Sequence, residues 1–216
     1  MFADGAPDLV LVGDAYVDKL DGSAYETPTS ATFVLDADST EQSYDGLVSH
    51  TRRDVEESAT KPADLLTVMY TSGTTGQPKA VPIDNFHGVN AALNNAYVHD
   101  LQPGNRILVP SPLFHVTGLV CGLLTAIART GTGVIMRDYD AQRFLEYVDA
   151  ERISYCMGVP THIVLAAEKA DDAAHDTSSF EKFAYGGAPM PPDAIPKIRE
   201  AFPDLKLYHS YGKTEN

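Results

Sequence analysis

One ten-residue stretch concentrates groups that suit the binding of a polyphosphate. It holds four Ser and Thr hydroxyls, two glycines and a lysine, in the order Tyr70-Thr71-Ser72-Gly73-Thr74-Thr75-Gly76-Gln77-Pro78-Lys79. Glycine permits turns in which successive backbone N–H groups point at one spot, and such a nest binds an anion. The hydroxyls add hydrogen-bond donors, and Lys79 adds a positive charge at the far rim. The stretch therefore predicts a phosphate-binding loop, with a polar surface turn as the alternative.

This stretch differs from the P-loop pattern, in which Gly-Lys-Ser/Thr enters a helix. Gln77 and Pro78 separate Gly76 from Lys79, and proline lacks an N–H and disfavours helix at the residue before it. Lys79 is therefore expected beyond the loop, and not at a helix N-terminus. The apolar run over residues 65–69 predicts a buried strand that leads into the loop.

Three further stretches interrupt the hydrophobic pattern, and each follows a predicted strand. They are residues 111–118 (SPLFHVTG), 186–190 (GGAPM) and 211–215 (YGKTE). In open α/β sheets, ligands bind at the carboxyl ends of the parallel strands. If the sheet is parallel, all four stretches are expected to meet at that edge.

Single residues in these stretches have structural as well as chemical interpretations. His115 lies between two apolar residues, so packing in the core is the alternative to a role in a site. Residues 186–189 carry no side chain larger than proline, which lets a flat ring or an acyl chain lie against the backbone; a tight strand-to-helix turn is the alternative. Tyr211 suits stacking on a base, Thr214 suits contact with phosphate, and Glu215 suits Mg²⁺.

The elements that must position these stretches alternate between strand and helix. Strands are predicted at residues 8–13, 31–36, 80–83, 106–110, 134–136, 153–157, 183–185 and 205–208, and helices at 84–98 (N-cap Asp84), 115–129, 141–152, 161–169 and 192–202. On the helix over 141–152, Phe144, Leu145 and Val148 share one face. The alternation predicts an α/β fold of largely parallel sheets flanked by helices.

The composition restricts the class of protein. Hydrophobic residues make up 44% of the 216 residues and charged residues 21%, as in ordinary globular proteins. Asp and Glu total 30 against 16 Lys and Arg, a net charge of −14, which argues against nucleic-acid binding because that needs a basic face. The excess of acids predicts a strongly solvated surface that suits high salt.

The sequence also carries signals for compartment. No apolar run reaches the length of a membrane span, and the first residues lack the pattern of a secretory signal. Cys121 and Cys156 are isolated in apolar surroundings, which predicts reduced core thiols, without a disulfide or a metal. These features predict a cytoplasmic protein with no membrane span.

Taken together, the motifs resemble the superfamily of AMP-forming acyl-CoA synthetases, adenylation domains and luciferases. The matching elements, in the family's order, are the Ser/Thr/Gly-rich loop ending Pro78-Lys79, Pro112-Leu113-Phe114-His115 with Gly118, Gly186-Gly187-Ala188-Pro189, and Tyr211-Gly212-x-Thr214-Glu215. Pro160-Thr161-His162 is similar to the Pro-Thr stretch of acyl- and aryl-CoA ligases. The resemblance covers residues 60–216, and it favours acyl- or aryl-CoA ligases.

The resemblance implies a role for each matched residue. The β- and γ-phosphates of ATP would be held by Thr71, Ser72, Gly73, Thr74, Thr75, Gly76 and Lys79. Gly187, Ala188 and Pro189 would face adenine and the acyl pocket. Tyr211 would stack on adenine, and Gly212 would belong to the same cofactor-binding set. Thr214 would contact the α-phosphate, Glu215 would bind Mg²⁺, and His115 would line the acyl site. The implied catalytic set is His115, Thr214, Glu215 and Lys79.

The implied reaction joins a small carboxylic acid to ATP as an acyl-adenylate and then transfers the acyl group to the thiol of coenzyme A. Residues 61–216 would form the ATP/AMP-binding core of the large domain, and residues 1–60 would be partial N-terminal strands and an acidic connector. The family's ribose-binding aspartate, hinge and small C-terminal domain find no match, so the sequence is expected to be a fragment of a ligase. Two alternatives are an amino-acid adenylation domain that serves a carrier protein and an inactive nucleotide-binding remnant.

Two positions depart from the family's pattern. Ala80 stands where many members have glycine, and aryl-CoA ligases tolerate this change. Lys213 stands where an apolar or small residue is usual. Its cation would pair with a polar group of the substrate or a phosphate, or it would point to solvent.

Overall fold

The computed structural model describes residues 9–13, 16–17, 32–35, 59–72, 76–170 and 175–215. The chain divides into two units, Met1–Thr60 and Lys61–Asn216. In the first unit, β1 (Val10–Gly13) pairs in parallel with β2 (Thr32–Leu35), which confirms both predicted strands. Among the described residues, no helix is both long and apolar enough to cross a membrane.

The second unit begins with an antiparallel hairpin that the parallel-sheet prediction did not include. β3 (Leu65–Thr71) pairs with β4 (Lys79–Asp84), so the residues between them form the loop of the predicted phosphate-binding stretch. The prediction of a buried strand over residues 65–69 is wrong. Met69 is the one buried residue of β3, and 59% of Leu65 is exposed. The reason is that β3 has a single strand partner in a two-stranded sheet and does not lie inside the large one.

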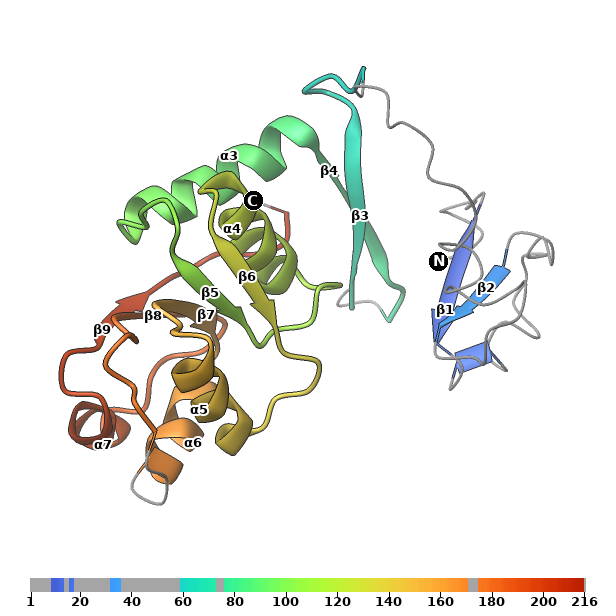
Figure 1. Ribbon diagram of the computed structural model, residues 1–216. Helices are drawn as coiled ribbons and strands as arrows, with labels where there is room; N and C mark the ends of the chain where they lie inside the picture. The colour runs from blue at the N-terminus through green and yellow to red at the C-terminus, as the bar shows by residue number, and fades with distance from the viewer. Residues whose placement is uncertain are drawn as a thin grey trace. The chain divides into compact units, whose positions relative to one another are not determined.

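The large sheet has five strands in the order β6-β5-β7-β8-β9, and all of its pairs are parallel (Figure 1). The strands are β5 (Arg106–Val109), β6 (Thr132–Ile135), β7 (Tyr155–Gly158), β8 (Lys182–Tyr185) and β9 (Lys206–His209). Each of them overlaps a predicted strand. The α/β class with largely parallel sheets is therefore confirmed.

Helices cover both faces of this sheet. One layer consists of α5 (Ala141–Ala150), α6 (Pro160–Ala170) and α7 (Ala194–Ala201), and the other of α3 (Asn85–Val98), η3 (Thr117–Leu124) and α4 (Thr125–Ala128) (Figure 1). Side chains alternate between the faces of a strand, and the two cores follow this period. Leu108 packs in the core beneath α5–α7, whereas its neighbours Ile107 and Val109 pack in the core on the other face.

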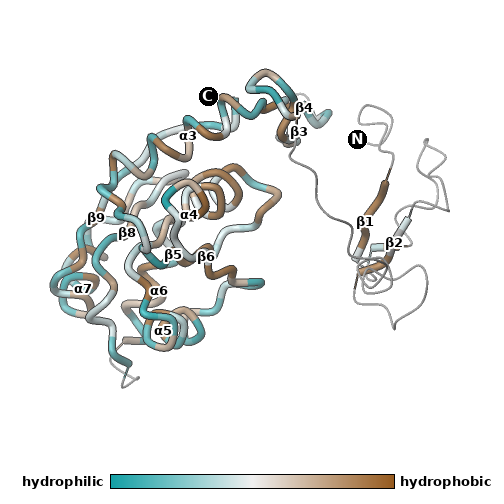
Figure 2. Tube along the Cα trace, turned by 45° about the horizontal axis from the view of Figure 1, so that its top comes forward, coloured by the Kyte–Doolittle hydropathy of each residue, from teal (hydrophilic) through white to brown (hydrophobic). Residues whose placement is uncertain are grey.

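Side-chain caps fix the starts of two helices. The Asp84 carboxylate accepts a hydrogen bond of 2.7 Å from the His87 N–H at the start of α3, which confirms the predicted N-cap. Asp140 accepts from the Arg143 N–H at 2.9 Å and caps α5 in the same way. The predicted face of α5, formed by Phe144, Leu145 and Val148, is fully buried. In Figure 2 the outer turns of α5 and α7 are largely teal, whereas the segment leading into α4 is brown.

The helix predicted at residues 115–129 is present, but its first part is a π-helix, η3, with wider turns than an α-helix. Two side chains add hydrogen bonds to carbonyls of this segment. The Thr125 hydroxyl donates to the Val120 carbonyl at 2.9 Å, and the Asn95 amide, from α3, donates to the Cys121 carbonyl at 3.1 Å. Cys121 and Cys156 are free thiols, and burial raises the pKa of Cys121 to about 11.

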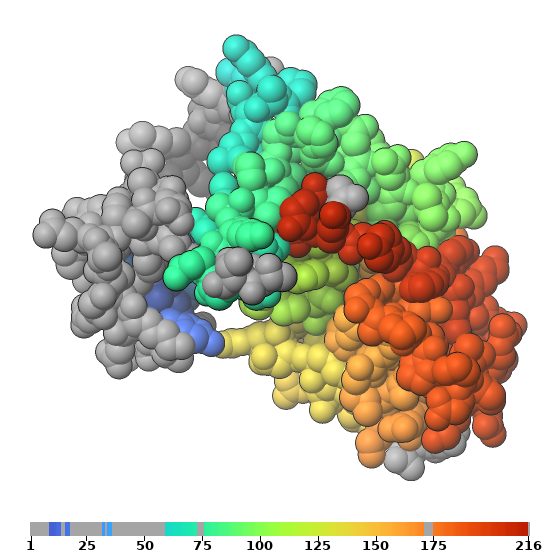
Figure 3. Space-filling model, turned by 180° about the vertical axis from the view of Figure 1, so that it is seen from behind, coloured from blue at the N-terminus to red at the C-terminus, as the bar shows by residue number. Residues whose placement is uncertain are grey.

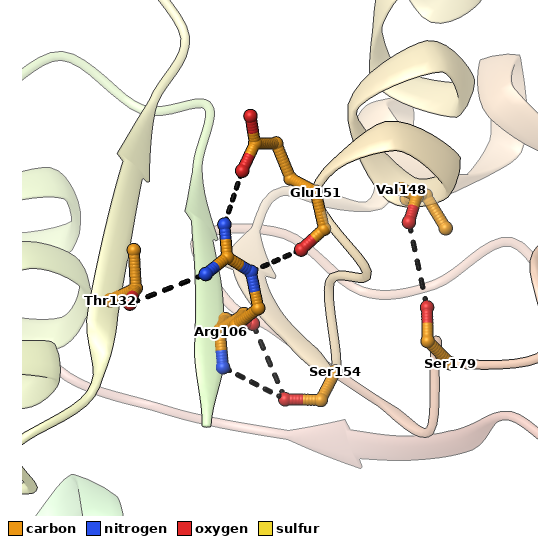
Figure 4. A network of polar contacts seen from close by, with 6 residues as sticks. All are labelled: Arg106, Thr132, Val148, Glu151, Ser154 and Ser179. Carbon is orange, nitrogen blue, oxygen red and sulfur yellow. Dashed lines mark hydrogen bonds and ion pairs between the residues drawn. The ribbon is translucent and has the colours of Figure 1, made fainter. Parts of the chain in front are cut away.

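The amino ends of the strands are tied by a polar network around Arg106, shown in Figure 4. The Arg106 guanidinium donates to both the carboxylate and the carbonyl of Glu151, at the end of α5, and to the Thr132 hydroxyl at 3.5 Å. The Ser154 hydroxyl accepts from the Arg106 N–H at 3.2 Å. This network joins β5, β6 and the segment before β7 at the amino edge of the sheet. The stretches at residues 111–118, 186–190 and 211–215 follow β5, β8 and β9 at the opposite, carboxyl edge.

Candidate functional site

A pocket of about 210 Å³ brings together three of the four predicted stretches. Its lining comes from the end of β3, from the turn before η3 and from the segment after β9. The lining residues are Met69, Tyr70, Thr71, Ser72, Phe114, His115, Val116 and Thr214. Figure 3 shows the red C-terminal segment reaching the green part of the chain. Thus Ser72, His115 and Thr214, far apart in the sequence, face one cavity.

The hairpin supplies two hydroxyls to this pocket, those of Thr71 and Ser72. Lys79 is the register partner of Thr71 across the hairpin and is exposed, although it is not among the lining residues. Gly76 adopts a φ of 82°, a left-handed conformation that favours glycine,. Gly73, Thr74 and Thr75 lie outside the described residues. The expectation that all four stretches follow strands of one parallel sheet is wrong for this one, because its loop joins two antiparallel strands.

His115 is exposed at the pocket, so the alternative of a histidine packed in the core is wrong. Its N–H donates to the Pro112 carbonyl at 3.1 Å, and its own carbonyl accepts from the Leu119 N–H at 3.0 Å. Its ring nitrogen Nδ1 accepts from the Thr117 N–H at 3.2 Å and lies 3.1 Å from the Thr117 hydroxyl. Both the backbone and the ring of His115 are therefore held by neighbouring residues.

Close packing explains the glycine that follows. A Cβ on Gly118 would lie 2.3 Å from the Pro112 carbonyl oxygen and 2.4 Å from that of Ser111. Both contacts are with backbone atoms, which have little freedom to move. Only glycine therefore lets η3 start this close to the end of β5.

The two remaining stretches leave the adjacent strands β8 and β9 side by side. The Ser210 N–H donates to the Tyr185 carbonyl at 2.8 Å, and a Cβ on Gly186 would lie 3.0 Å from the Ser210 carbonyl oxygen. Gly187 has a φ of 77°. Beyond these contacts the predicted site residues are solvent-exposed and outside the pocket lining; they are Gly187, Ala188, Pro189, Tyr211, Gly212 and Glu215. Lys213 is exposed as well.

Four lining residues were not predicted as site residues: Met69, Tyr70, Phe114 and Val116. Phe114 is 82% exposed, although large aromatic side chains are usually buried,. Tyr70, Phe114 and Val116 each adjoin a predicted site residue and lie within the stretches that the sequence analysis identified, whereas Met69 lies two residues before Thr71 and carried no such signal. Strand alternation could not have selected Met69 together with Tyr70, because neighbouring residues point to opposite faces.

The lining has the polarity expected of an anion site. It contains the hydroxyls of Thr71, Ser72 and Thr214 and the imidazole of His115, and no carboxylate is among the lining residues of this described pocket. In the described part of the chain, no group of three or more His, Cys, Asp or Glu side chains is arranged to hold a metal ion. Any divalent cation here would therefore depend on single carboxylates such as Glu215 and on oxygens of the ligand, which is how Mg²⁺ usually binds beside phosphates.

Comparison with known proteins decides the family. The sequence model of the family described as "AMP-binding enzyme" matches residues 1–216. The chain belongs to the AMP-binding enzyme family. Its curated relatives include the putative acyl-CoA synthetase YngI of Bacillus subtilis (30% identical over 152 residues) and 4-chlorobenzoate–CoA ligase of Pseudomonas sp. (32% over 150 residues). These matches cover 70% and 68% of the chain but 28% of each relative, so the chain spans less than a third of their length.

Solved structures of the AMP-binding family agree with this fold. The N-terminal domain of FACL13 from Mycobacterium tuberculosis, in an inhibitor-bound crystal structure, superposes with a TM-score of 0.80 at 27% identity. That match covers 99% of this chain and 52% of the other. The fold also matches a long-chain-fatty-acid–CoA ligase from Archaeoglobus fulgidus, with a TM-score of 0.83 at 21% identity over 98% of this chain and 44% of the other.

Proposed function

We propose that this chain is part of an AMP-forming acyl- or aryl-CoA ligase and carries its ATP-binding and acid-binding groups. The observation that carries the proposal is the pocket in which Ser72, His115 and Thr214 meet. Each comes from a different motif, and a merely structural role would not require all three to face one cavity. The CoA-ligase relatives support the choice of coenzyme A as acceptor over a carrier protein.

In this proposal the hydroxyls bind phosphate. Thr71 and Ser72 donate to the β- and γ-phosphates, together with the loop of residues 73–76 and the Lys79 ammonium. Thr214 donates to the α-phosphate, which the carboxylate of the substrate attacks. Reactions at phosphorus depend mainly on positioning and on neutralising charge. Hydrogen-bond donors in the lining would position the phosphates and offset their charge. The absence of carboxylates from the lining matters because the chain as a whole has a net charge of −14.

The other motif residues complete the proposed site. His115 contacts the carboxylic acid, Tyr211 with Gly212 contacts adenine, and the open backbone of residues 187–189 borders adenine and the acyl group. Glu215 is exposed next to Thr214, which suits a carboxylate that shares Mg²⁺ with phosphate oxygens. When bound, Mg²⁺ neutralises phosphate charge. A cytoplasmic location belongs to the same proposal.

ATP binding tests the proposal on this chain. We expect the double variant Ser72→Ala/Thr214→Val to bind ATP at least about tenfold more weakly, because hydrogen bonds to charged groups contribute about 1.5–3 kcal/mol each. Calorimetric titration gives the affinity. The control is Ser178→Ala, which removes an exposed hydroxyl outside the pocket lining. Equal affinity of the double variant and the parent would contradict the proposed phosphate contacts.

The activity itself requires the natural protein from its source cells, whose intact mass should be measured first. Acid-dependent exchange of pyrophosphate into ATP is expected, followed by formation of a CoA thioester. Exchange without a CoA thioester, but with transfer to a carrier protein, would favour the adenylation-domain alternative. ATP binding without exchange would favour the inactive remnant.

A further inference from the structure

The hydrogen bonds of His115 determine which of its nitrogens carries the proton. A backbone N–H can only donate, and the Thr117 N–H is directed at His115 Nδ1 at 3.2 Å. Nδ1 must therefore be an unprotonated acceptor, because a hydrogen on it would face the hydrogen of the Thr117 amide. Neutral imidazole has one N–H, so in this ring the hydrogen is on Nε2.

The Thr117 side chain adds to the same restraint. Its hydroxyl oxygen lies 3.1 Å from Nδ1, and a hydroxyl rotates to donate where an acceptor is present. Two donors from one residue thus converge on a single ring nitrogen. They hold the ring in one orientation as well as in one tautomer, as second partners of a histidine commonly do.

The residue that supplies these donors is itself held in place. Thr117 is the first residue of η3 and half-buried. The next residue, Gly118, is buried against the carbonyl oxygens of Ser111 and Pro112. π-helical turns occur frequently at functional sites, and here η3 starts at the residue whose N–H meets the His115 ring.

We propose that Thr117 is a positioning residue for His115, whose neutral ring it holds as the Nε2–H tautomer. His115 then offers the pocket a hydrogen-bond donor and not a general base. This step rests on the proposed function, because a carboxylic acid is already ionised near neutral pH and needs a donor to orient it, with no proton to remove. The proposal assigns a function to Thr117, which was neither a predicted site residue nor a lining residue of the pocket.

Nitrogen NMR of the 216-residue chain labelled with ¹⁵N-histidine tests the tautomer without any ligand. His115→Gln identifies the His115 signals by their loss. In the parent, Nδ1 should resonate as an unprotonated nitrogen and Nε2 as a protonated one. Thr117→Val keeps the amide donor but lacks the hydroxyl, so Nε2 should stay protonated and the Nδ1 signal should shift, because Nδ1 loses one of its two donors. Thr117→Ser, which keeps the hydroxyl, should restore the parent pattern.

Several results would overturn the proposal. These are a parent spectrum with the hydrogen on Nδ1, an averaged mixture of tautomers in the parent, or a Thr117→Val spectrum equal to that of the parent. The parent spectrum alone decides the tautomer, even if Thr117→Val fails to fold.

Binding of octanoyl sulfamoyl adenosine, a stable analogue of an acyl-adenylate, separates this inference from the proposed function. We expect Thr117→Val to bind it about threefold to tenfold more weakly than the parent, the range for one neutral hydrogen bond, and Thr117→Ser to bind it as the parent does. Equal binding by the valine variant would overturn the positioning role. If the parent shows the Nε2–H tautomer and binds no analogue, the proposed function fails while the assignment of the tautomer stands.

Discussion

We expect a partly buried imidazole, that of His162, to make the stability of this fold depend on pH. The ring of His162 stacks on Tyr139, with centroids 4.3 Å apart and planes at 20°, and a Cβ on Gly158 would lie 2.4 Å from its Nδ1. Burial lowers the pKa of His162 from 6.5 to about 4. Between these two values the unfolded chain binds a proton that the folded chain does not, so the free energy of unfolding rises with pH across this window.

We predict that His162→Phe flattens this dependence, because phenylalanine keeps a ring beside Tyr139 and binds no proton. The contribution of His162 is fully present above pH 6.5 and is lost as the pH falls toward about 4; allowing for partial exposure, it amounts to about 1–2 kcal/mol. Urea unfolding at several pH values measures it. The control is the difference in unfolding free energy between the parent and His162→Phe above pH 6.5. There His162 is neutral in both the folded and the unfolded chain, so only the packing of the ring differs. Equal slopes in the two proteins would contradict the prediction.

Individual residues differ in how far the sequence could predict them. The sequence identified His115 by its neighbours Pro112 and Gly118, but it left open whether the ring was buried. Exposure depends on what lies across from a residue in space, and here that includes Ser72 and Thr214. The contact between Thr117 and His115 is local, yet a single threonine two residues after a histidine carries no pattern of its own.

For helices and strands, the sequence predicted the hydrophobic periodicity and the helix caps, but it did not predict which elements pack against one another. The N-cap Asp84 and the buried face of α5 follow from local rules, and both predictions are confirmed. The apolar run of β3 looks the same whether a strand lies within a large sheet or in an exposed hairpin. The hydrogen bond to the Cys121 carbonyl of η3 comes from Asn95, which lies on another helix, so no window around residues 117–124 contains this contact.

Asn95 provides the test at this scale. Its amide nitrogen, which has two hydrogens to donate, lies within hydrogen-bond distance (3.1–3.3 Å) of the Cys121 carbonyl, the Thr125 hydroxyl and the Tyr155 hydroxyl, and so links α3 with η3, α4 and β7. We predict that Asn95→Ala lowers the free energy of unfolding by about 1–3 kcal/mol, the cost of leaving buried polar groups without a partner. Asn95→Asp should be no better, because an ionised carboxylate has no hydrogen to donate.

The matched control is Asn90→Ala on the same helix. The Asn90 amide also donates to a carbonyl, that of Phe86 at 2.7 Å, but the site is exposed and water can replace it. Chemical unfolding of the three variants measures the difference. If Asn90→Ala costs as much as Asn95→Ala, the link between the helices contributes no special stability.

For the whole second unit, the sequence predicted the class of fold and the order of the motifs. It did not predict the geometry of the site, because residues from two different sheets line the pocket. The pocket takes Thr71 and Ser72 from an antiparallel hairpin, and His115 and Thr214 from loops after strands of the parallel sheet. The rule that ligands bind at the carboxyl edge of a parallel sheet predicts the positions of His115 and Thr214. It does not predict that Thr71 and Ser72 come from a separate hairpin. The end of β3 lines the same cavity as the loops of the parallel sheet, and α3 links the two parts, since it contacts both β4 and η3.

The charge of the whole chain leads to the last prediction. With a net charge of −14, repulsion between carboxylates opposes the compact state, and added salt screens it. We predict that the melting temperature rises steadily from low salt to molar KCl. The matched control is the triple variant Glu146→Gln/Glu168→Gln/Glu200→Gln, which removes three exposed charges from α5, α6 and α7. It should melt higher than the parent at low salt and gain less from KCl, because less repulsion remains to be screened. A melting temperature that falls or stays level as KCl is added would show that the acidic surface does not limit stability, and a triple variant with the same salt response as the parent would remove these three carboxylates from the cause.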